Sequence, residues 1–439
     1  MYKKKDRETG ELFSEFFPFG GRLDVGNRWL KISELVPWDE LERMYSSRLS
    51  RVGRPASDAR LVLGLLMLKH MTNLSDGELT KEFSENVYMQ AFCGLEHFLT
   101  SDILDSSTLT YVRRRLGADF VREMESLTYR TLVDKKIIKG RGMLCDATVV
   151  PEKISYPNDV GLLEKCRSKV VDFVKRQGAK FGMKFRTYCR KARTLALDFS
   201  KKKNKTKKMI RNAKKKSLNF LSRNIRQAEE VIGEAAKFGE DLAVDGFETI
   251  KEICRQQMDM YKMNVNRIGD RIVSISRPYV RPIKRGKDGK DVEFGPKGAF
   301  SHVGGFLFLD HMSHDNFSEA GKAVVELQVK NFEKLFGRKP GSFTGDNLYG
   351  NMENRKFLAE KEIRAAFKPL GRKSPVKSLA EKRWLKKKHR ERNRIEGAFG
   401  HGKEHGGLKP IRYKSREGSE IWIRLGLFGM NMKKAAAMS

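Results

Sequence analysis

The predicted strand 143–150 most constrains the fold, because a long helical range, 159–269, separates it from the next strand signals. Later runs with strand character lie at 271–276, 298–303, 305–310, 342–346 and 363–367. Amphipathic helical patterns lie between the last runs, as expected where parallel strands need helical crossovers. We therefore predict an α/β chain whose mixed sheet is interrupted after its first strand by a helical insertion.

The order of the later elements narrows the topology. A hairpin around Gly304-Gly305 precedes a helix over 320–336, the strand 342–346, another helix, the strand 363–367 and two final helices. Three antiparallel strands followed by parallel strands joined by helices is the order of a ribonuclease-H-like sheet. In that order the first strand and the strand 342–346 are central neighbours.

Residues 56–116 have the pattern of three short helices. Leucines spaced i, i+4 and i+7 form one face of the first helix. Ser75 and Glu78 form a capping box that begins the second, and the third, over 109–116, carries Arg113 and Arg114. A helix-turn-helix DNA reader has this arrangement, and so does a small helical bundle that does not read DNA.

These patterns divide the chain into four predicted segments. They are an N-terminal arm (1–55), a helical, helix-turn-helix-like DNA-binding domain (56–135), a sheet domain (136–158 and 270–439) and a basic helical insertion (159–269).

The charge balance indicates the class of partner. The chain has 89 Lys and Arg against 55 Asp and Glu, a net charge of +34, which favours a nucleic acid or another anionic surface. Blocks of lysine within the insertion are either solvated tips or contacts to a phosphate backbone. We predict the second role for Lys201, Lys202, Lys207, Lys208 and Lys215.

No apolar run is long enough for a membrane span, and the charged N-terminus is not that of a signal peptide. The cysteines lack the spacing of zinc ligands, and their odd number fits a reducing compartment: Cys93, Cys145, Cys166, Cys189 and Cys254. We therefore expect a cytoplasmic protein without membrane contact.

Three carboxylates stand out by position. Asp146 interrupts an apolar strand, where an acid is unfavourable unless it is paired or bound to a metal; an exposed edge strand is the alternative. Asp346 ends a strand, where open α/β sheets bind ligands, and Glu396 lies on a helix that follows the last strand. If the three converge, two Mg²⁺ or Mn²⁺ ions about 3.5–4 Å apart would balance their charge.

The helix around Glu396 carries a second pattern. At about 100° per residue, His389, Arg392, Glu396 and Lys403 fall within a wedge of about 60°. A carboxylate among cations on one face suits a metal ligand beside a polyanion, and a solvated basic helix is the alternative. Glycines at 397, 400 and 402 weaken the helix, so Lys403 shares this face only if the helix continues through them.

Together these motifs resemble the DDE transposases of bacterial insertion sequences, and among them the InsH-like group. The family signature Tyr-x2-Arg-x3-Glu-x6-Lys is similar to Arg392-x3-Glu396-x6-Lys403, with His389 in place of the tyrosine. The acidic motifs resemble Cys145-Asp146-Ala147-Thr148 and Gly345-Asp346-Asn347-Leu348-Tyr349-Gly350. The segment around Leu61–Leu95, which contains Leu74–Leu79, is similar to that group's N-terminal helical domain.

The resemblance implies a metal-dependent endonuclease of a mobile element. It would bind the terminal inverted repeats of double-stranded DNA, cleave a phosphodiester and transfer the 3′-hydroxyl end to target DNA, working as a homodimer in the synaptic complex. Asp146, Asp346 and Glu396 would hold the metal ions, and Arg392 and Lys403 would hold DNA phosphates. His389 would change DNA handling more than metal binding.

The same residues are compatible with two other functional hypotheses. A ribonuclease-H-like nuclease would cut without strand transfer, and an inactive descendant of a transposase would only bind DNA. Four further residues, Asp310, His311, His314 and Asp315, could suggest a second metal site, but we assign them a structural or turn-capping role. We predict that Asp159 caps the first helix of the insertion.

Overall fold

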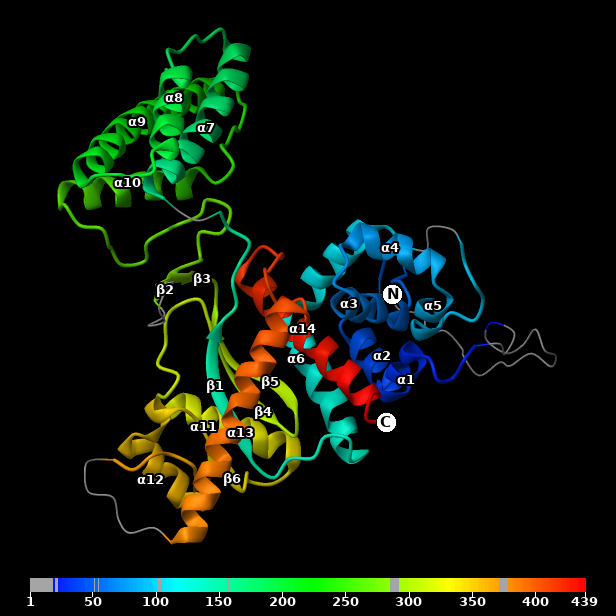
Figure 1. Cartoon of the computed structure of the whole chain (residues 1–439). Helices are drawn as coiled ribbons and strands as arrows, with labels where there is room; N and C mark the ends of the chain where they lie inside the picture. The colour runs from blue at the N-terminus through cyan, green and yellow to red at the C-terminus, as the bar shows by residue number, and fades with distance from the viewer. Residues whose placement is uncertain are drawn as a thin grey trace. The chain divides into compact units, whose positions relative to one another are not determined.

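The computed structural model describes residues 19, 23–50, 52–53, 55–100, 104–155, 158–284, 292–370 and 378–439. The chain forms two compact units, one made of residues 1–152 and 296–439 and the other of residues 153–295 (Figure 1). The second unit is therefore longer at both ends than the predicted insertion, 159–269. We describe each unit by itself.

The first unit is built around a five-stranded mixed sheet of order β5-β4-β1-β6-β7. Its strands are β1 (Met143–Val149), β4 (Lys297–Val303), β5 (Phe306–Ser313), β6 (Ser342–Thr344) and β7 (Arg364–Ala365). Strands β1, β4 and β5 pair antiparallel, whereas β6 runs parallel to both β1 and β7. The predicted hairpin and the central pairing of the first strand with 342–346 are confirmed.

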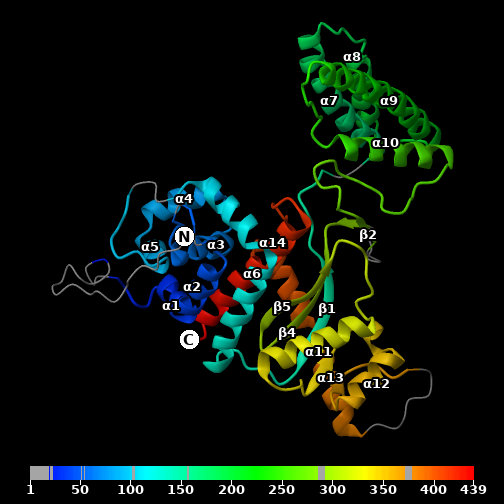
Figure 2. The ribbon, with the colours of Figure 1, turned by 180° about the vertical axis from the view of Figure 1, so that it is seen from behind.

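Alternating side chains of β1 face two separate cores. Met143 and Cys145 pack with α11 (Lys322–Phe336) and α12 (Met352–Glu360). Leu144 packs on the opposite face with α13 (Leu379–Glu404) and α14 (Arg416–Ala436). Figure 1 shows α13 in front of the sheet, and Figure 2 shows α11 on the other side. Since strand side chains alternate, Asp146 and Thr148 share the α13 face with Leu144.

Among the described residues, six helices precede the sheet. They are α1 (Arg28–Leu35), α2 (Trp38–Ser47), α3 (Ala59–Thr72), α4 (Asp76–Glu85), α5 (Val87–Phe92) and α6 (Ser106–Asp134). Their apolar side chains share one core with α14, so the range 56–135 lies in the same compact unit as the sheet. The capping box of Ser75 and Glu78 is confirmed.

The third predicted helix is much longer than 109–116. Helix α6 continues to Asp134, but Gly117 has φ 72° and kinks it. Glu417 Oε1 accepts a hydrogen bond from Ala118 N at 2.9 Å, so this carboxylate caps the second half of α6. A side chain at Gly117 would meet the same oxygen, at 2.7 Å from its Cβ.

The second unit is a helical bundle with a small two-stranded sheet. Its elements are α7 (Asp159–Gly178), η3 (Ala179–Phe181), α8 (Cys189–Lys201), α9 (Lys207–Lys237), α10 (Phe247–Lys262), β2 (Pro282–Lys284) and β3 (Val292–Phe294). Helices α7, α9 and α10 enclose its core. The strand predicted at 271–276 is wrong, because this segment is irregular.

Asp159 does not cap α7. Asn158 is the N-cap and accepts from Gly161 N at 2.6 Å. Asp159 instead pairs with Lys214, at 3.1 Å, and with Arg271. It therefore ties three segments of the second unit together.

Within the described residues, no helix is long and apolar enough to cross a membrane.

Candidate functional site

The strand register sets Asp146 and Asp346 side by side. Leu144 of β1 pairs with Thr344 of β6, and each Asp follows its strand residue by two positions. Neighbouring strands lie about 4.8 Å apart, so the two acids leave adjacent parallel strands at one level. Asp346 begins the short helix η4 (Asn347–Gly350), where its carboxylate accepts from Leu348 N at 2.8 Å.

The surroundings of Asp146 disfavour its charge. Burial raises its pKa to about 6, and the nearby carboxylates of Glu319 and Asp346 act in the same direction. A hydrogen bond from Ala147 N, at 2.8 Å, and the charge of Arg392 oppose the rise. Asp146 is thus a partly buried acid with two acidic neighbours, an arrangement that a cation would stabilise.

Helix α13 packs on β1 and β6 and carries the third predicted carboxylate. It runs without a break from Leu379 to Glu404, so the glycines do not end it before Lys403. Ile395 and Phe399 are its buried side chains against the sheet. At about 100° per residue, the wedge that holds Glu396 and Lys403 flanks this buried face.

The polar side chains of α13 have defined partners. Arg392 donates to Glu396 Oε1 at 2.7 Å, and the charge of Arg392 also acts on Asp146. Lys403 Nζ donates to Thr148 Oγ1 at 2.8 Å, two positions beyond Asp146 on β1. The helix therefore contacts the first acidic strand through Lys403, and the charge of Arg392 reaches Asp146 of the same strand. Glu396 is half-exposed and paired with Arg392.

A divalent metal fits part of this arrangement. Carboxylate oxygens are the ligands that Mg²⁺ and Mn²⁺ prefer, and the neighbours Asp146 and Asp346 supply them. Among the described residues, no three His, Cys, Asp or Glu side chains are close enough together to hold a metal ion. The predicted three-carboxylate cluster is therefore not assembled here, since the carboxylate of Glu396 is held by Arg392.

Glu319 is a fourth acid at this site that the sequence reasoning missed. It precedes α11 and pairs with Lys297 of β4 at 2.6 Å. Its charge acts on both Asp146 and the buried Tyr349. The residues around Glu319 match no acidic motif. The one sequence signal for it is its position a few residues after the predicted strand 305–310.

Replacing Glu319 by Gln tests whether its charge acts on Asp146. Loss of its charge should lower the pKa of Asp146 from about 6 towards the usual range of an aspartate. We expect the titration midpoint of the Asp146 carboxyl, followed by NMR of its side-chain carbon, to move to lower pH. An exposed acid of α12, replaced in Glu353→Gln, is the control. An unchanged midpoint would show that the charge of Glu319 does not act on Asp146.

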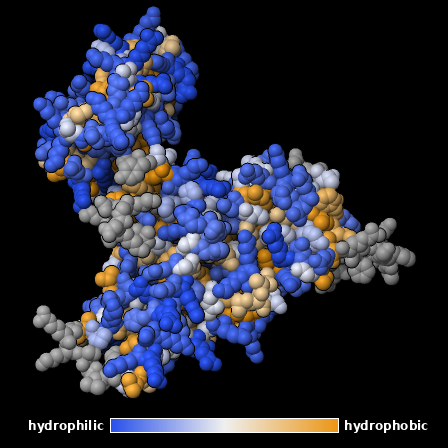
Figure 3. All heavy atoms as spheres, viewed as in Figure 1, coloured by the Kyte–Doolittle hydropathy of each residue, from blue (hydrophilic) through white to orange (hydrophobic). Residues whose placement is uncertain are grey.

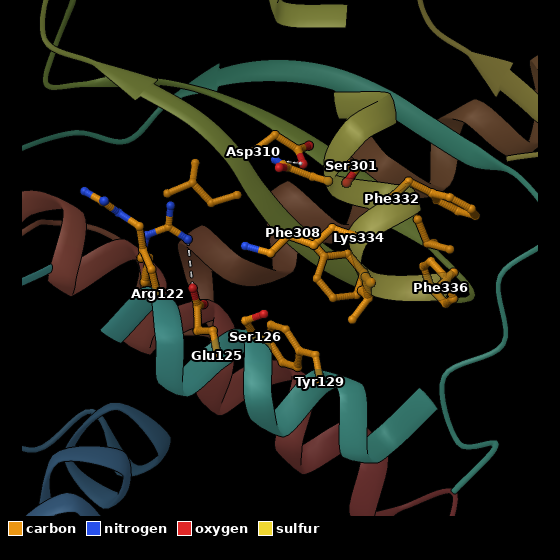
Figure 4. Close-up of a pocket in the computed structure, with 15 residues that line it drawn as sticks. Arg122, Glu125, Ser126, Tyr129, Ser301, Phe308, Asp310, Phe332, Lys334 and Phe336 are labelled. Atoms are coloured by element: carbon orange, nitrogen blue, oxygen red, sulfur yellow. Dashed lines mark hydrogen bonds and ion pairs between the residues drawn. The ribbon is translucent and has the colours of Figure 1, made fainter. Parts of the chain in front are cut away.

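The four residues that could suggest a second metal site, Asp310, His311, His314 and Asp315, have other partners in the structure. Asp310 is buried beside a cavity of about 250 Å³ between α6, α11 and β5 (Figure 4). It accepts from Asn331 Nδ2 at 3.1 Å. His314 is paired with Glu152 at 3.0 Å, and the His311 ring packs edge-on against Phe317. These contacts give Asp310, His311 and His314 structural roles.

The burial of Asp310 leads to a prediction about how the free energy of unfolding depends on pH. Burial raises its pKa to about 7, so the folded state holds a proton that the unfolded chain releases near pH 4. The resulting stabilisation is complete below about pH 4 and is lost as pH rises through 7. It amounts to at most about 4 kcal/mol at about 1.4 kcal/mol per pH unit. Asp310→Asn should flatten this part of the pH profile of urea unfolding, whereas the exposed Asp315→Asn should leave it unchanged.

The predicted DNA-binding arginines of α6 differ in exposure. Arg113 is buried, and its guanidinium donates to both oxygens of Asp76, at 2.7 and 3.2 Å. Such a bidentate pair holds Arg113 within the protein, so its predicted contact with DNA is not supported. Arg114 is exposed. The half-buried His389 and the exposed side chains of α13 stay candidates for DNA contact.

The predicted lysines of the second unit are all exposed. Lys201 ends α8 and Lys202 follows it, Lys207 and Lys208 begin α9, and Lys215 lies two turns further. Between Asp172 and Glu229 the sole acidic residue of the sequence is Asp198. The viewed face of α7–α10 is mostly hydrophilic (Figure 3). We define these five lysines as the lysine tip.

Comparisons with known proteins add two matches to protein families. A family described as Transposase domain (DUF772) matches residues 18–115, and one described as Transposase DDE domain matches residues 344–433. The second match contains both Asp346 and Glu396. A stretch of 166 residues is 29% identical to an uncharacterized protein, ORF8 in the nfe locus, of Rhizobium meliloti; it covers 37% of this chain and 80% of that protein. No solved structure matches the chain.

Proposed function

Because this chain is a DDE transposase of the insertion-sequence type, we propose that it binds the terminal inverted repeats of double-stranded DNA, cleaves them and joins the freed 3′-hydroxyl ends to target DNA. We propose further that the sheet is of the ribonuclease-H-like kind, that the enzyme belongs to the InsH-like group and that it acts as a homodimer, since synapsis joins two ends.

The observation that carries this proposal is the register of β1 and β6. It sets Asp146 and Asp346 at adjacent carboxyl ends, on the face that α13 covers. Burial and acidic neighbours raise the pKa of Asp146 to about 6, which is expected of a carboxylate whose natural partner is a cation.

We assign Asp146 and Asp346 as ligands of two Mg²⁺ or Mn²⁺ ions, with Glu396 as the third ligand. Such ions would activate the attacking water or 3′-hydroxyl and stabilise the leaving oxygen. In the DNA-free protein, Arg392 would keep Glu396 from a metal ion through their ion pair, in which Arg392 Nη2 lies 2.7 Å from Glu396 Oε1. When a DNA phosphate takes Arg392, the carboxylate of Glu396 becomes available to a cation.

DNA binding in this proposal uses both units. Lys403 reaches Thr148 at the first acidic strand, where a phosphate could replace the hydroxyl as its partner. Two lysines of the lysine tip, Lys207 and Lys208, begin α9, whose first turn contains no acidic residue. Lysines beside the positive end of a helix dipole are unfavourable alone and become favourable with an anion between them.

An assay with purified protein, Mg²⁺ and a plasmid carrying candidate terminal repeats tests the proposal. Cleaved and joined products together support a transposase. Cleavage without joining would support a nuclease, and binding without cleavage an inactive relative. The assay is informative only with the DNA that flanks the coding region, since the terminal repeats lie there.

A further inference from the structure

A basic cavity lies in the first unit away from the carboxylates. It has a volume of about 690 Å³ and is bounded by α3, α4, α6 and the segment that leads into α14. Five cations line it: Lys69, Arg113, Arg114, Arg412 and Lys414. A volume of this size is within the range of sites for nucleotide-sized ligands, about 300–1,000 Å³.

The two carboxylates of the cavity are already engaged. Asp76 binds Lys69 Nζ at 2.6 Å as well as the guanidinium of Arg113. Glu417 accepts from Ala118 N at the kink of α6. The positive charge of the cavity therefore exceeds its negative charge, with Arg114, Arg412 and Lys414 exposed at its opening.

Aromatic packing holds the inner wall in place. The Tyr413 ring lies 4.8 Å from Trp422, edge to face, and the Arg113 guanidinium lies over Tyr413 at 4.4 Å. Tyr413 Oη and His70 Nε2 are 3.1 Å apart, which fixes the tyrosine to α3. Burial, followed by the charges of Lys69, Arg113 and Arg412, holds the pKa of His70 well below its usual value. The wall is thus held by ring packing and a hydrogen bond, and the charged groups near His70 are mostly cations.

We propose that this cavity binds a nucleotide phosphate of DNA, as an anchor separate from the carboxylate site. A cavity with excess positive charge and exposed arginines at its opening suits a phosphodiester. The proposal rests on the proposed function only for the choice of DNA as the source of the phosphate; a free nucleotide has the same chemistry. Arg114 and Arg412 contact the phosphate, while Lys69 and Arg113 supply charge from behind.

The test is the binding of a fluorescent 25-bp duplex in EDTA, where no cleavage occurs. The double variant Arg114→Gln/Arg412→Gln should bind the duplex about tenfold more weakly. Its plot of log affinity against log salt should lose about 0.9 units of slope, since the loss of one phosphate contact removes about that much. Arg130→Gln, an exposed arginine further along α6, should match the wild type.

Competition with dAMP distinguishes the two sources of phosphate. If millimolar dAMP weakens duplex binding by the wild type but not by the double variant, the cavity accepts a single nucleotide. If dAMP has no effect while the double variant is impaired, the cavity requires the DNA backbone. Lys414→Gln provides a second variant should the double variant fail to fold as judged by its thermal unfolding.

Wild-type affinity and salt slope in both the double variant and Lys414→Gln would overturn the proposal. Since no cleavage is measured, its failure is distinguishable from failure of the proposed catalysis. Asp346→Asn could retain cleavage while the double variant loses affinity, in which case the carboxylate assignment fails and the cavity stands.

Discussion

Replacing Asp346 by Asn should lower the rate of DNA cleavage at least about 10³-fold, because the substitution removes the charge of a proposed metal ligand at the carboxyl end of β6. The same loss is expected for Asp146→Asn, whose carboxylate lies at the matching position of β1. The measurement is the single-turnover cleavage of a terminal-repeat duplex in Mg²⁺. Duplex binding in EDTA should change little, since neither acid contributes positive charge.

The control for these variants is Asp315→Asn, which neutralises an exposed aspartate just after β5. It should cleave within about twofold of the wild type, because Asp315 is not on the α13 face of β1 or β6. Full cleavage by Asp346→Asn would show that the carboxylate assignment is wrong. A similar loss in Asp315→Asn would mean that lowering of negative charge in general, not ligand loss, is responsible.

Replacing Lys201, Lys202 and Lys207 by Gln should weaken duplex binding by roughly 10–100-fold at moderate salt, because three phosphate contacts are removed. The slope of log affinity against log salt should fall by nearly 3 for the same reason. The folding of the second unit should not change, since all three side chains are exposed and outside its core. Fluorescence anisotropy over a salt series measures both quantities.

A matched triple variant in the same unit controls for net charge. Lys169, Lys237 and Lys251 are already paired with Asp245, Glu234 and Glu248, each at 2.7 Å. Their replacement by Gln removes the same charge but, by our assignment, no phosphate contact. Equal losses in the two triple variants would mean that the second unit attracts DNA only through its overall charge.

Much of the fold was predictable because its signals are local. The capping box at Ser75, the glycine hairpin between β4 and β5 and the apolar strand around Asp146 each depend on residues close in sequence. The strand predicted at 271–276 failed because short alternation alone does not supply a pairing partner. The helix predicted at 109–116 was too short because Gly117 reads as a stop, whereas Glu417 caps its continuation from a distant segment.

For the candidate site, the sequence by itself determined which acids could matter and where each lies in its element. It also determined the excess of positive charge and the order of strands that makes β1 and β6 neighbours. Only the tertiary structure decided that Arg392 holds Glu396, that Asp76 occupies Arg113 and that Glu319 joins the acids of the sheet. The reason is physical: periodicity fixes which way a side chain faces, but pairing energies depend on which distant charge arrives within a few ångströms.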